Sequence, residues 1–147
     1  MSTSRLDLGF MHQPTNTMLE KKSLTALLST VKYLPNRTPQ AGFTGEASAA
    51  FALVSTYRDG SIYVGHYSGS SEWERHEKGD EIVLALEGTT TVVVVLDTGV
   101  EQHVSLEAGE LVVVPRGAWH RFENSMSLKV MSVTPAPTDH ALERPDA

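Results

Sequence analysis

The chain has 147 residues, 40% of them hydrophobic and 20% charged, which is enough for one domain with its own core but not for two. Its formal net charge is −6 and it has no basic block longer than Lys21-Lys22, which argues against nucleic acid or a membrane surface as a partner. It contains no cysteine, so disulfides and thiolate ligands are excluded and a bound metal would need nitrogen and oxygen donors. With no signal-peptide core or membrane-length apolar run in the sequence, we expect a cytoplasmic location.

The N-terminal arm, residues 1–49, contains one pattern that is typical of a helix. Its apolar residues recur at helical spacing at Leu24, Leu27, Leu28 and Val31. We therefore predict a helix over about residues 18–34, in which Thr17 and Glu20 can form a capping box. Residues 36–46 are typical of a loop.

From residue 50 onward, short β-type runs alternate with turn signals. Residues 51–57 and 61–67 flank Asp59-Gly60, a strong hairpin signal. Six further runs follow, at residues 82–86, 89–96, 100–106, 111–114, 119–122 and 128–133. About eight short strands at close spacing predict an all-β sandwich or barrel over residues 50–134. The polar, Pro-containing tail, residues 135–147, is expected to be loosely ordered.

The run at residues 89–96 is apolar on both faces. A strand of this kind is normally covered on both sides. One cover would be the barrel core, and the other would be the N-terminal helix or a second subunit. We therefore expect a homodimer.

A polar cluster, WERHEKGDE at residues 73–81, precedes an apolar strand. Side chains alternate along a strand, so Glu74 and His76 should point one way, and Trp73 and Arg75 the other. Glu81 opens the next strand, where an inward carboxylate is costly unless it is paired or serves a cation.

A second polar segment, GELVVVPRGAWHRFEN, spans residues 109–124. Pro115 and Gly117 indicate a turn, so His120 begins the returning strand close to the barrel rim. This places His120 opposite Glu74, His76 and Glu81, as part of a candidate metal site.

The two polar segments resemble the two sequence motifs of the cupin superfamily. The second motif, G-x5-P-x-G-x2-H-x3-N, is matched at every position, by Gly109, Pro115, Gly117, His120 and Asn124. The first, G-x5-H-x-H-x3,4-E-x6-G, is matched by His76, Glu81 and Gly88. Glu74 replaces its first histidine, and Gly69 stands one residue closer than the motif requires.

The resemblance covers about residues 50–134 and is to small single-domain bacterial cupins of the conserved-barrel type. It implies an antiparallel double-stranded β-helix, the jelly-roll or cupin barrel, with a short N-terminal helix. It also implies one divalent metal ion (Fe, Mn, Ni or Zn), and homodimers are common in the family. By position, the metal ligands would be Glu74, His76, Glu81 and His120.

The replacement of a histidine by Glu74 changes the chemistry that the resemblance implies. Carboxylate oxygen is a competent ligand, but two histidines and two glutamates bring a divalent site to zero net charge. Such a site is a weaker Lewis acid and suits manganese or iron(II) better than copper. Two alternatives stay open. Glu74 could lie off the metal, leaving His76, Glu81 and His120 as a 2-His-1-carboxylate triad, or the four groups could hydrogen-bond without metal.

Two classes of function fit this sequence. One is a metal-dependent enzyme acting on a small organic acid, sugar or aromatic, as a dioxygenase, isomerase or decarboxylase. The other is a non-catalytic module that binds or senses a small molecule. A structural barrel with a relict pocket fits less well. Of the remaining histidines, we expect His103 to face solvent and His140 to lie in the tail, so neither is a good ligand candidate.

Overall fold

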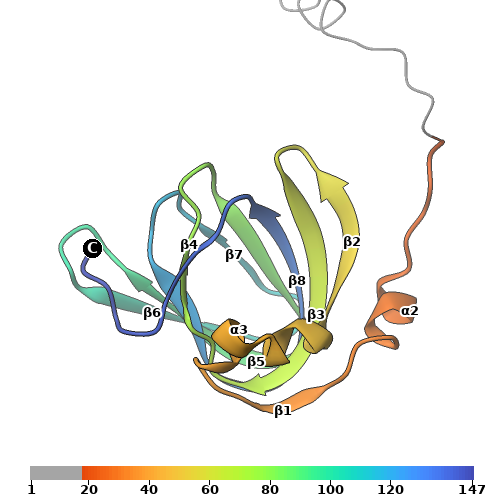
Figure 1. Ribbon diagram of the computed structural model, residues 1–147, viewed down its shortest axis with the longest axis horizontal. Coiled ribbons are helices and arrows are strands. Elements are labelled where there is room, and N and C mark those ends of the chain that lie inside the picture. The colour runs from red at the N-terminus through yellow and green to blue at the C-terminus, as the bar shows by residue number, and fades with distance from the viewer. Residues whose placement is uncertain (1–17) are drawn as a thin grey trace, which may run out of the picture.

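The computed structural model describes residues 18–147, in which nine strands form one continuous, strongly curled sheet (Figure 1). The strands are β1 (Leu34–Arg37), β2 (Phe51–Tyr57), β3 (Gly60–Gly69), β4 (Trp73–Arg75), β5 (Glu81–Val95), β6 (Glu101–Leu106), β7 (Leu111–Val114), β8 (His120–Pro135) and β9 (Asp139–Ala141). The short helices are α2 (Leu24–Leu28), α3 (Ala41–Thr44) and the 3-10 helix η1 (Glu46–Ala50). The predicted β-barrel with a short N-terminal helix is confirmed. Between residues 18 and 147, no helix has the length and apolar character needed to cross a membrane.

Two long bent strands, β5 and β8, connect the two halves of the barrel. They pair antiparallel with each other, and β5 also pairs with β7 near its start and with β6 near its end. The sequence predicted separate strands on either side of Gly88, but the structure joins them into one. Gly88 has a φ of +76°, and a Cβ there would lie 2.3 Å from the carbonyl oxygen of Ser127. Glycine therefore allows the bend and the close approach of β8.

The core fills the barrel interior with side chains from both halves of the sheet. Its buried members are Tyr67, Val83, Ala85, Val92, Leu106, Val114, Phe122, Leu128 and Val130. These are mostly the inward positions of strands whose side chains alternate between the two faces of the sheet. Three of them, Tyr67, Phe122 and Val130, also line a cavity.

The outer face of the second half of β5 is covered within the same chain. Val93 and Val95 pack against Trp73, with Trp119 and Ala141 alongside. The cover was predicted to be the N-terminal helix or a second subunit, but α2 lies on β2 and β3 instead. This face of β5 therefore no longer supports the predicted homodimer.

The N-terminal arm departs from its predicted structure. The helix is much shorter than residues 18–34, because Ser23 caps it by accepting from Ala26 N at 3.1 Å. At its other end the Ser29 and Thr30 hydroxyls donate back to backbone carbonyls, a bonding mode that competes with helix continuation. Within the predicted loop, α3 forms, and β1 pairs parallel with β3. The predicted capping residue Thr17 lies outside the described residues.

The C-terminal tail is ordered where the sequence predicted a loose segment. Its strand β9 pairs antiparallel with β4, in the register Glu74↔His140 and Arg75↔Asp139. The Arg75 guanidinium donates two hydrogen bonds to Asp139 Oδ2, at 2.9 and 3.0 Å. A three-residue strand carries no periodic signal, so this pairing could not be read from the sequence.

Candidate functional site

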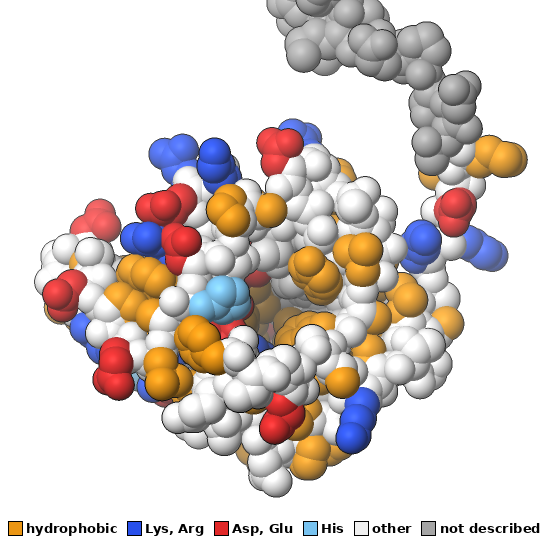
Figure 2. Space-filling model, viewed as in Figure 1, with side chains coloured by type: hydrophobic (Ala, Val, Ile, Leu, Met, Phe, Trp, Pro, Cys, Tyr) orange, Lys and Arg blue, Asp and Glu red, His pale blue; other side chains and the backbone are white. Residues whose placement is uncertain are grey.

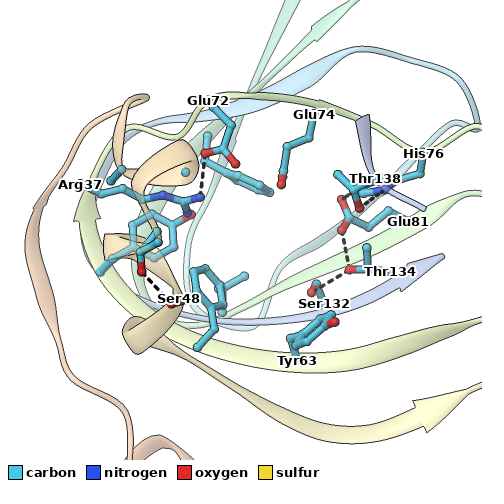
Figure 3. Close-up of a pocket in the computed structure, with 18 residues that line it drawn as sticks. Arg37, Ser48, Tyr63, Glu72, Glu74, His76, Glu81, Ser132, Thr134 and Thr138 are labelled. Carbon is cyan, nitrogen blue, oxygen red and sulfur yellow. Dashed lines mark hydrogen bonds and ion pairs between the residues drawn. The ribbon is translucent and has the colours of Figure 1, made fainter. Parts of the chain in front are cut away.

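A cavity of about 280 Å³ opens at one end of the barrel, and Figure 2 shows the hollow on that face. Strands β3, β4, β5 and β8 form most of its wall, and α3 with η1 closes one side (Figure 3). Aromatic rings contribute much of the apolar lining: Phe51, Tyr63, Tyr67 and Phe122. The carboxylates Glu72, Glu74 and Glu81 line the cavity on the side of β4 and β5.

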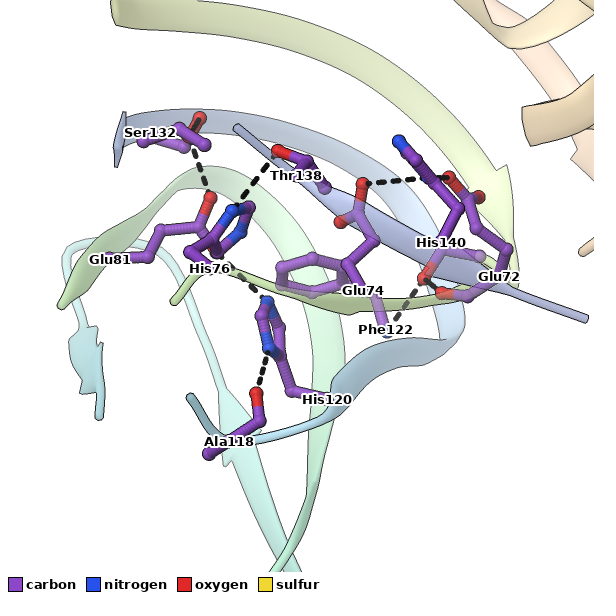
Figure 4. A network of polar contacts seen from close by, with 12 residues as sticks. Glu72, Glu74, His76, Glu81, Ala118, His120, Phe122, Ser132, Thr138 and His140 are labelled. Atoms are coloured by element: carbon purple, nitrogen blue, oxygen red, sulfur yellow. Dashed lines mark hydrogen bonds and ion pairs between the residues drawn. The ribbon is translucent and has the colours of Figure 1, made fainter. Parts of the chain in front are cut away.

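The four predicted site residues meet at this end of the cavity. Glu74 lies on β4 directly opposite His120 at the start of β8, His76 follows β4, and Glu81 opens β5. Glu81 Oε1 lies 3.0 Å from His120 Nε2 and 3.4 Å from His76 Nε2. One donor atom each from Glu74, His76 and His120 lies within 4.8 Å of the others. The sequence therefore identified four side chains that the fold brings together (Figure 4).

The alternation predicted along β4 is also observed. Glu74 and His76 line the cavity, whereas Trp73 points to the opposite side, where it is buried against Val93 and Val95. The guanidinium carbon of Arg75 lies 4.7 Å from the Trp119 ring centroid. One face of this short segment thus serves the cavity and the other serves packing.

His120 is completely buried and is held at both ring nitrogens. Its Nδ1 contacts the carbonyl oxygen of Ala118 at 3.0 Å, and a carbonyl can only accept, so Nδ1 carries a proton. Its Nε2 faces a carboxylate oxygen of Glu81, which also only accepts. Without a cation between them, Nε2 must therefore carry a second proton. Burial lowers the pKa of His120, but the hydrogen bond to Glu81 and the charges of Glu81 and Glu74 outweigh it, so the pKa is raised.

The pKa values of the two glutamates at the site are shifted in opposite directions. Burial raises the pKa of Glu81, yet the hydrogen bond from His120 and the nearby charges of His120 and His76 lower it to about 2. Thr134 also donates to Glu81 Oε2 at 2.6 Å. The pKa of Glu74 is raised by burial and by the negative charges of Glu81 and Glu72. Glu81 is therefore a fixed anion, while Glu74 takes up a proton more readily.

His76 has a buried ring nitrogen that could hold a cation. Its Nδ1 lies 3.0 Å from Thr138 Oγ1, but its Nε2 is buried without a hydrogen-bond partner among the described residues. The nearest carboxylate oxygen, Glu81 Oε1 at 3.4 Å, does not have hydrogen-bond geometry. Buried polar atoms are normally paired, so an unpaired ring nitrogen between carboxylates fits a metal ligand. The nitrogen and oxygen donors also suit a divalent metal.

A chain of charges that the sequence did not predict extends from this cluster. Arg37 Nη2 lies 3.1 Å from Glu72 Oε1, and Glu72 Oε2 lies 3.0 Å from His140 Nδ1. His140 Nδ1 is in turn 3.8 Å from Glu74 Oε2. The prediction that His140 is a poor ligand candidate because it lies in the tail is thus wrong, since β9 brings it beside the site. One signal was available for Glu72: it shares the alternating face of Glu74 and His76.

Two further histidines of the described residues, His66 and His103, lie away from the cluster. His103 is bonded to Glu101 at 2.9 Å and its side chain is 52% exposed, which confirms the prediction that it faces solvent. His66 packs its ring 4.4 Å from that of Tyr33. Neither residue lines the cavity.

The cavity offers no unpaired positive side chain to a ligand. Among the described residues that line it, Arg37 is the only lysine or arginine, and its charge is paired with Glu72. Hydroxyl groups supply further polar lining: Ser48, Tyr63, Ser132, Thr134 and Thr138. The arrangement can bind a small molecule with an apolar body and a few hydrogen-bonding groups.

The barrel is similar to a known family and to solved structures. Residues 64–134 match the family model described as a cupin domain. A cupin-2 domain protein from Shewanella frigidimarina is 23% identical with a TM-score of 0.51, and the match covers 64% of this chain and 92% of that one. No curated protein matches the chain by sequence.

Two enzymes of known structure share the fold at low sequence identity. Hydroquinone 1,2-dioxygenase PnpCD, in complex with Cd²⁺ and 4-hydroxybenzonitrile, is 15% identical with a TM-score of 0.57, over 86% of this chain and 83% of that one. Oxalate decarboxylase from Lactobacillus farciminis, in a formate complex, is 15% identical with a TM-score of 0.50. That match covers 61% of this chain and only 30% of the enzyme.

Proposed function

The barrel belongs to the cupin superfamily, with its cupin domain at residues 64–134, and on this basis we propose that the protein is a metal-dependent enzyme acting on a small organic molecule. The observation that carries the proposal is the buried, unpaired Nε2 of His76. His76 forms a group with His120 and Glu74 whose donor atoms lie within 4.8 Å of one another, and Glu81 Oε1 lies 3.4 Å from His76 Nε2 and 3.0 Å from His120 Nε2. These groups lie at the wall of a cavity with room for a small substrate.

In this proposal His76 and His120 supply nitrogen ligands, and Glu74 and Glu81 supply oxygen ligands. Glu74 has a donor atom within 4.8 Å of those of both histidines, and Glu81 Oε1 lies 3.0 Å from His120 Nε2 and 3.4 Å from His76 Nε2, so both carboxylates are within reach of the histidine pair. A bound divalent metal would act as a Lewis acid toward an oxygen of the substrate. Thr134 and the Ala118 carbonyl orient Glu81 and His120 for this role.

The ligand charges guide the choice of metal. Two neutral imidazoles and two carboxylates balance a divalent ion, which favours a harder metal such as manganese or iron(II) within the Fe, Mn, Ni and Zn set. The charges that line the cavity also indicate which substrates it favours. Because the only lining guanidinium, that of Arg37 in the described residues, is paired with Glu72, an anionic substrate gains little electrostatic attraction. The aromatic lining favours an uncharged molecule with an apolar ring and a hydroxyl group.

Among the three reaction types, we favour oxygenation. The likeness to hydroquinone 1,2-dioxygenase spans 86% of this chain, and that enzyme is in complex with a hydroxylated aromatic compound, 4-hydroxybenzonitrile. The charge balance of the cavity also suits such a neutral compound better than a small dicarboxylate. Decarboxylation of an organic acid would lack a cationic side chain to hold the acid group.

The test is turnover by protein loaded with iron(II) or manganese(II). Oxygen uptake and product formation would be followed with panels of hydroxylated aromatics, neutral sugars and small organic acids. We expect turnover of a hydroxylated aromatic by the wild type and by His103→Ala, which changes an exposed histidine outside the site. His120→Ala should abolish it with the fold intact. A ligand that raises the melting temperature while no panel member is converted would contradict the enzyme and indicate a binding module.

The homodimer and the cytoplasmic location stay predictions. Light scattering after size-exclusion chromatography tests the first, since a dimer has twice the 16.0 kDa mass of the chain. Elution at the mass of one chain at micromolar concentration would contradict the homodimer.

A further inference from the structure

We propose that Thr138 is a positioning residue for His76, and that the C-terminal segment, residues 136–141, contributes to the metal site by holding Thr138 in place. This inference rests on the metal site of the proposed function. It assigns a role to a segment outside the cupin domain at residues 64–134, in a tail that the sequence pattern marked as loose. The observation behind it is the contact between Thr138 Oγ1 and His76 Nδ1 at 3.0 Å (Figure 4).

The two histidines of the site are held in the same way. His120 uses Nδ1 to donate to the carbonyl oxygen of Ala118, which leaves Nε2 directed at the site. His76 uses Nδ1 toward the Thr138 hydroxyl, and its Nε2 lies 3.4 Å from Glu81 Oε1 at the site. A hydroxyl can accept a hydrogen bond as a carbonyl does. When Thr138 accepts from Nδ1–H, the neutral ring keeps its lone pair on Nε2, as a metal ligand requires.

Contacts on both sides of Thr138 hold its hydroxyl in place. On the N-terminal side, Ala136 N donates to the carbonyl oxygen of Asp59 at 3.1 Å. On the C-terminal side, β9 pairs with β4, and Asp139 and His140 are bonded to Arg75 and Glu72. Because β4 also carries Glu74, the strand that supplies one site residue fixes the segment that orients another.

The effect of removing the hydroxyl follows from this geometry. Valine has nearly the shape of threonine but can neither donate nor accept, so Thr138→Val frees the His76 ring to rotate and to place its proton on Nε2. Loss of a group that orients a metal-binding histidine typically weakens metal affinity about 10–100-fold. Serine keeps the hydroxyl, so Thr138→Ser should stay close to the wild type.

The experiment measures the affinity for Zn²⁺ and Co²⁺ by competition with a chromophoric chelator. The variants are Thr138→Val, Thr138→Ala and Thr138→Ser, with Thr56→Val as the matched control on the exposed part of β2. We expect a loss of about 10–100-fold in the first two, near wild-type affinity in Thr138→Ser and in the control, and an altered visible spectrum of the Co²⁺ form in Thr138→Val. Melting temperatures of the metal-free variants report whether each one folds.

The outcomes separate this inference from the proposed function. Wild-type protein that binds neither ion overturns both. Wild-type binding that Thr138→Val retains in full overturns the role of Thr138 alone and leaves the metal site standing. A loss in Thr138→Val but not in Thr138→Ala indicates a steric effect, and a loss in Thr138→Ser shows that the hydroxyl does not rescue the site. Either of these two results overturns the positioning role.

Discussion

Removing the Thr134 hydroxyl should reveal how the buried Glu81 carboxylate is held. Thr134 Oγ1 donates to Glu81 Oε2 at 2.6 Å, a distance typical of a charge-assisted O–H···O⁻ bond. Glu81 is buried and ionised, with a pKa lowered to about 2. Thr134→Val keeps the side-chain shape and removes this donor, together with the contact between Thr134 Oγ1 and Ser132 Oγ at 3.0 Å.

The expected cost follows from the type of hydrogen bond. Hydrogen bonds to charged groups contribute about 1.5–3 kcal/mol to stability, and those between neutral groups about 0.5–1.5. We therefore expect Thr134→Val to lower the unfolding free energy of the metal-free protein by about 2 kcal/mol. In a Glu81→Gln background the acceptor is neutral, so the same change should cost about 1 kcal/mol or less.

The assay is a double-mutant cycle by urea unfolding at pH 7 with chelator present, followed by the fluorescence of the buried Trp73. The cycle isolates the interaction between the two side chains from any general effect of the substitutions. Equal costs of Thr134→Val in the wild-type and Glu81→Gln backgrounds would refute the charge-assisted bond. So would a cost in the wild type indistinguishable from that of Thr56→Val.

Three further predictions concern charge. The Glu81 carboxyl should titrate near pH 2 in the ¹³C NMR spectrum of the metal-free protein. Because its folded pKa is depressed, its contribution to stability is complete above pH 4.5 and is lost as the pH falls through about 2; titration near 4.5 would contradict this. The pKa of His120 is raised, and metal binding must displace a proton from this ring. The affinity for metal, measured by chelator competition, should therefore fall about tenfold per pH unit below that pKa and level off above it. Arg37→Leu should lower the free energy of unfolding in urea by about 3–5 kcal/mol, because it removes the buried partner of Glu72. Adding Glu72→Gln should recover part of the loss. A loss under about 1 kcal/mol in Arg37→Leu would argue against a strong pair.

Much of the barrel and its site could be predicted because strand period and turn chemistry are local. Alternation alone placed Glu74 and His76 on the face opposite Trp73. The Asp59-Gly60 turn gave the β2–β3 hairpin. The turn at Pro115 and Gly117 put His120 at the start of β8, beside the other three site residues.

The parts that were missed depend on tertiary contacts between distant segments. The strand β9 exists because it pairs with β4 and because Arg75 binds Asp139, and nothing in its three residues indicates this. Thr138 and His140 come to the site by the same route. Arg37 enters the cavity wall because β1 pairs with β3, a parallel pairing with no local signal.

Metal content tests the central claim most directly. Protein purified without nickel resin or chelator would be measured by elemental analysis, beside His120→Ala and the exposed-site control His103→Ala. The account predicts about one iron or manganese per chain in the wild type and in His103→Ala, and none in His120→Ala. Wild-type protein that remains free of metal after reconstitution with iron(II), manganese(II), nickel(II) and zinc(II) would contradict it.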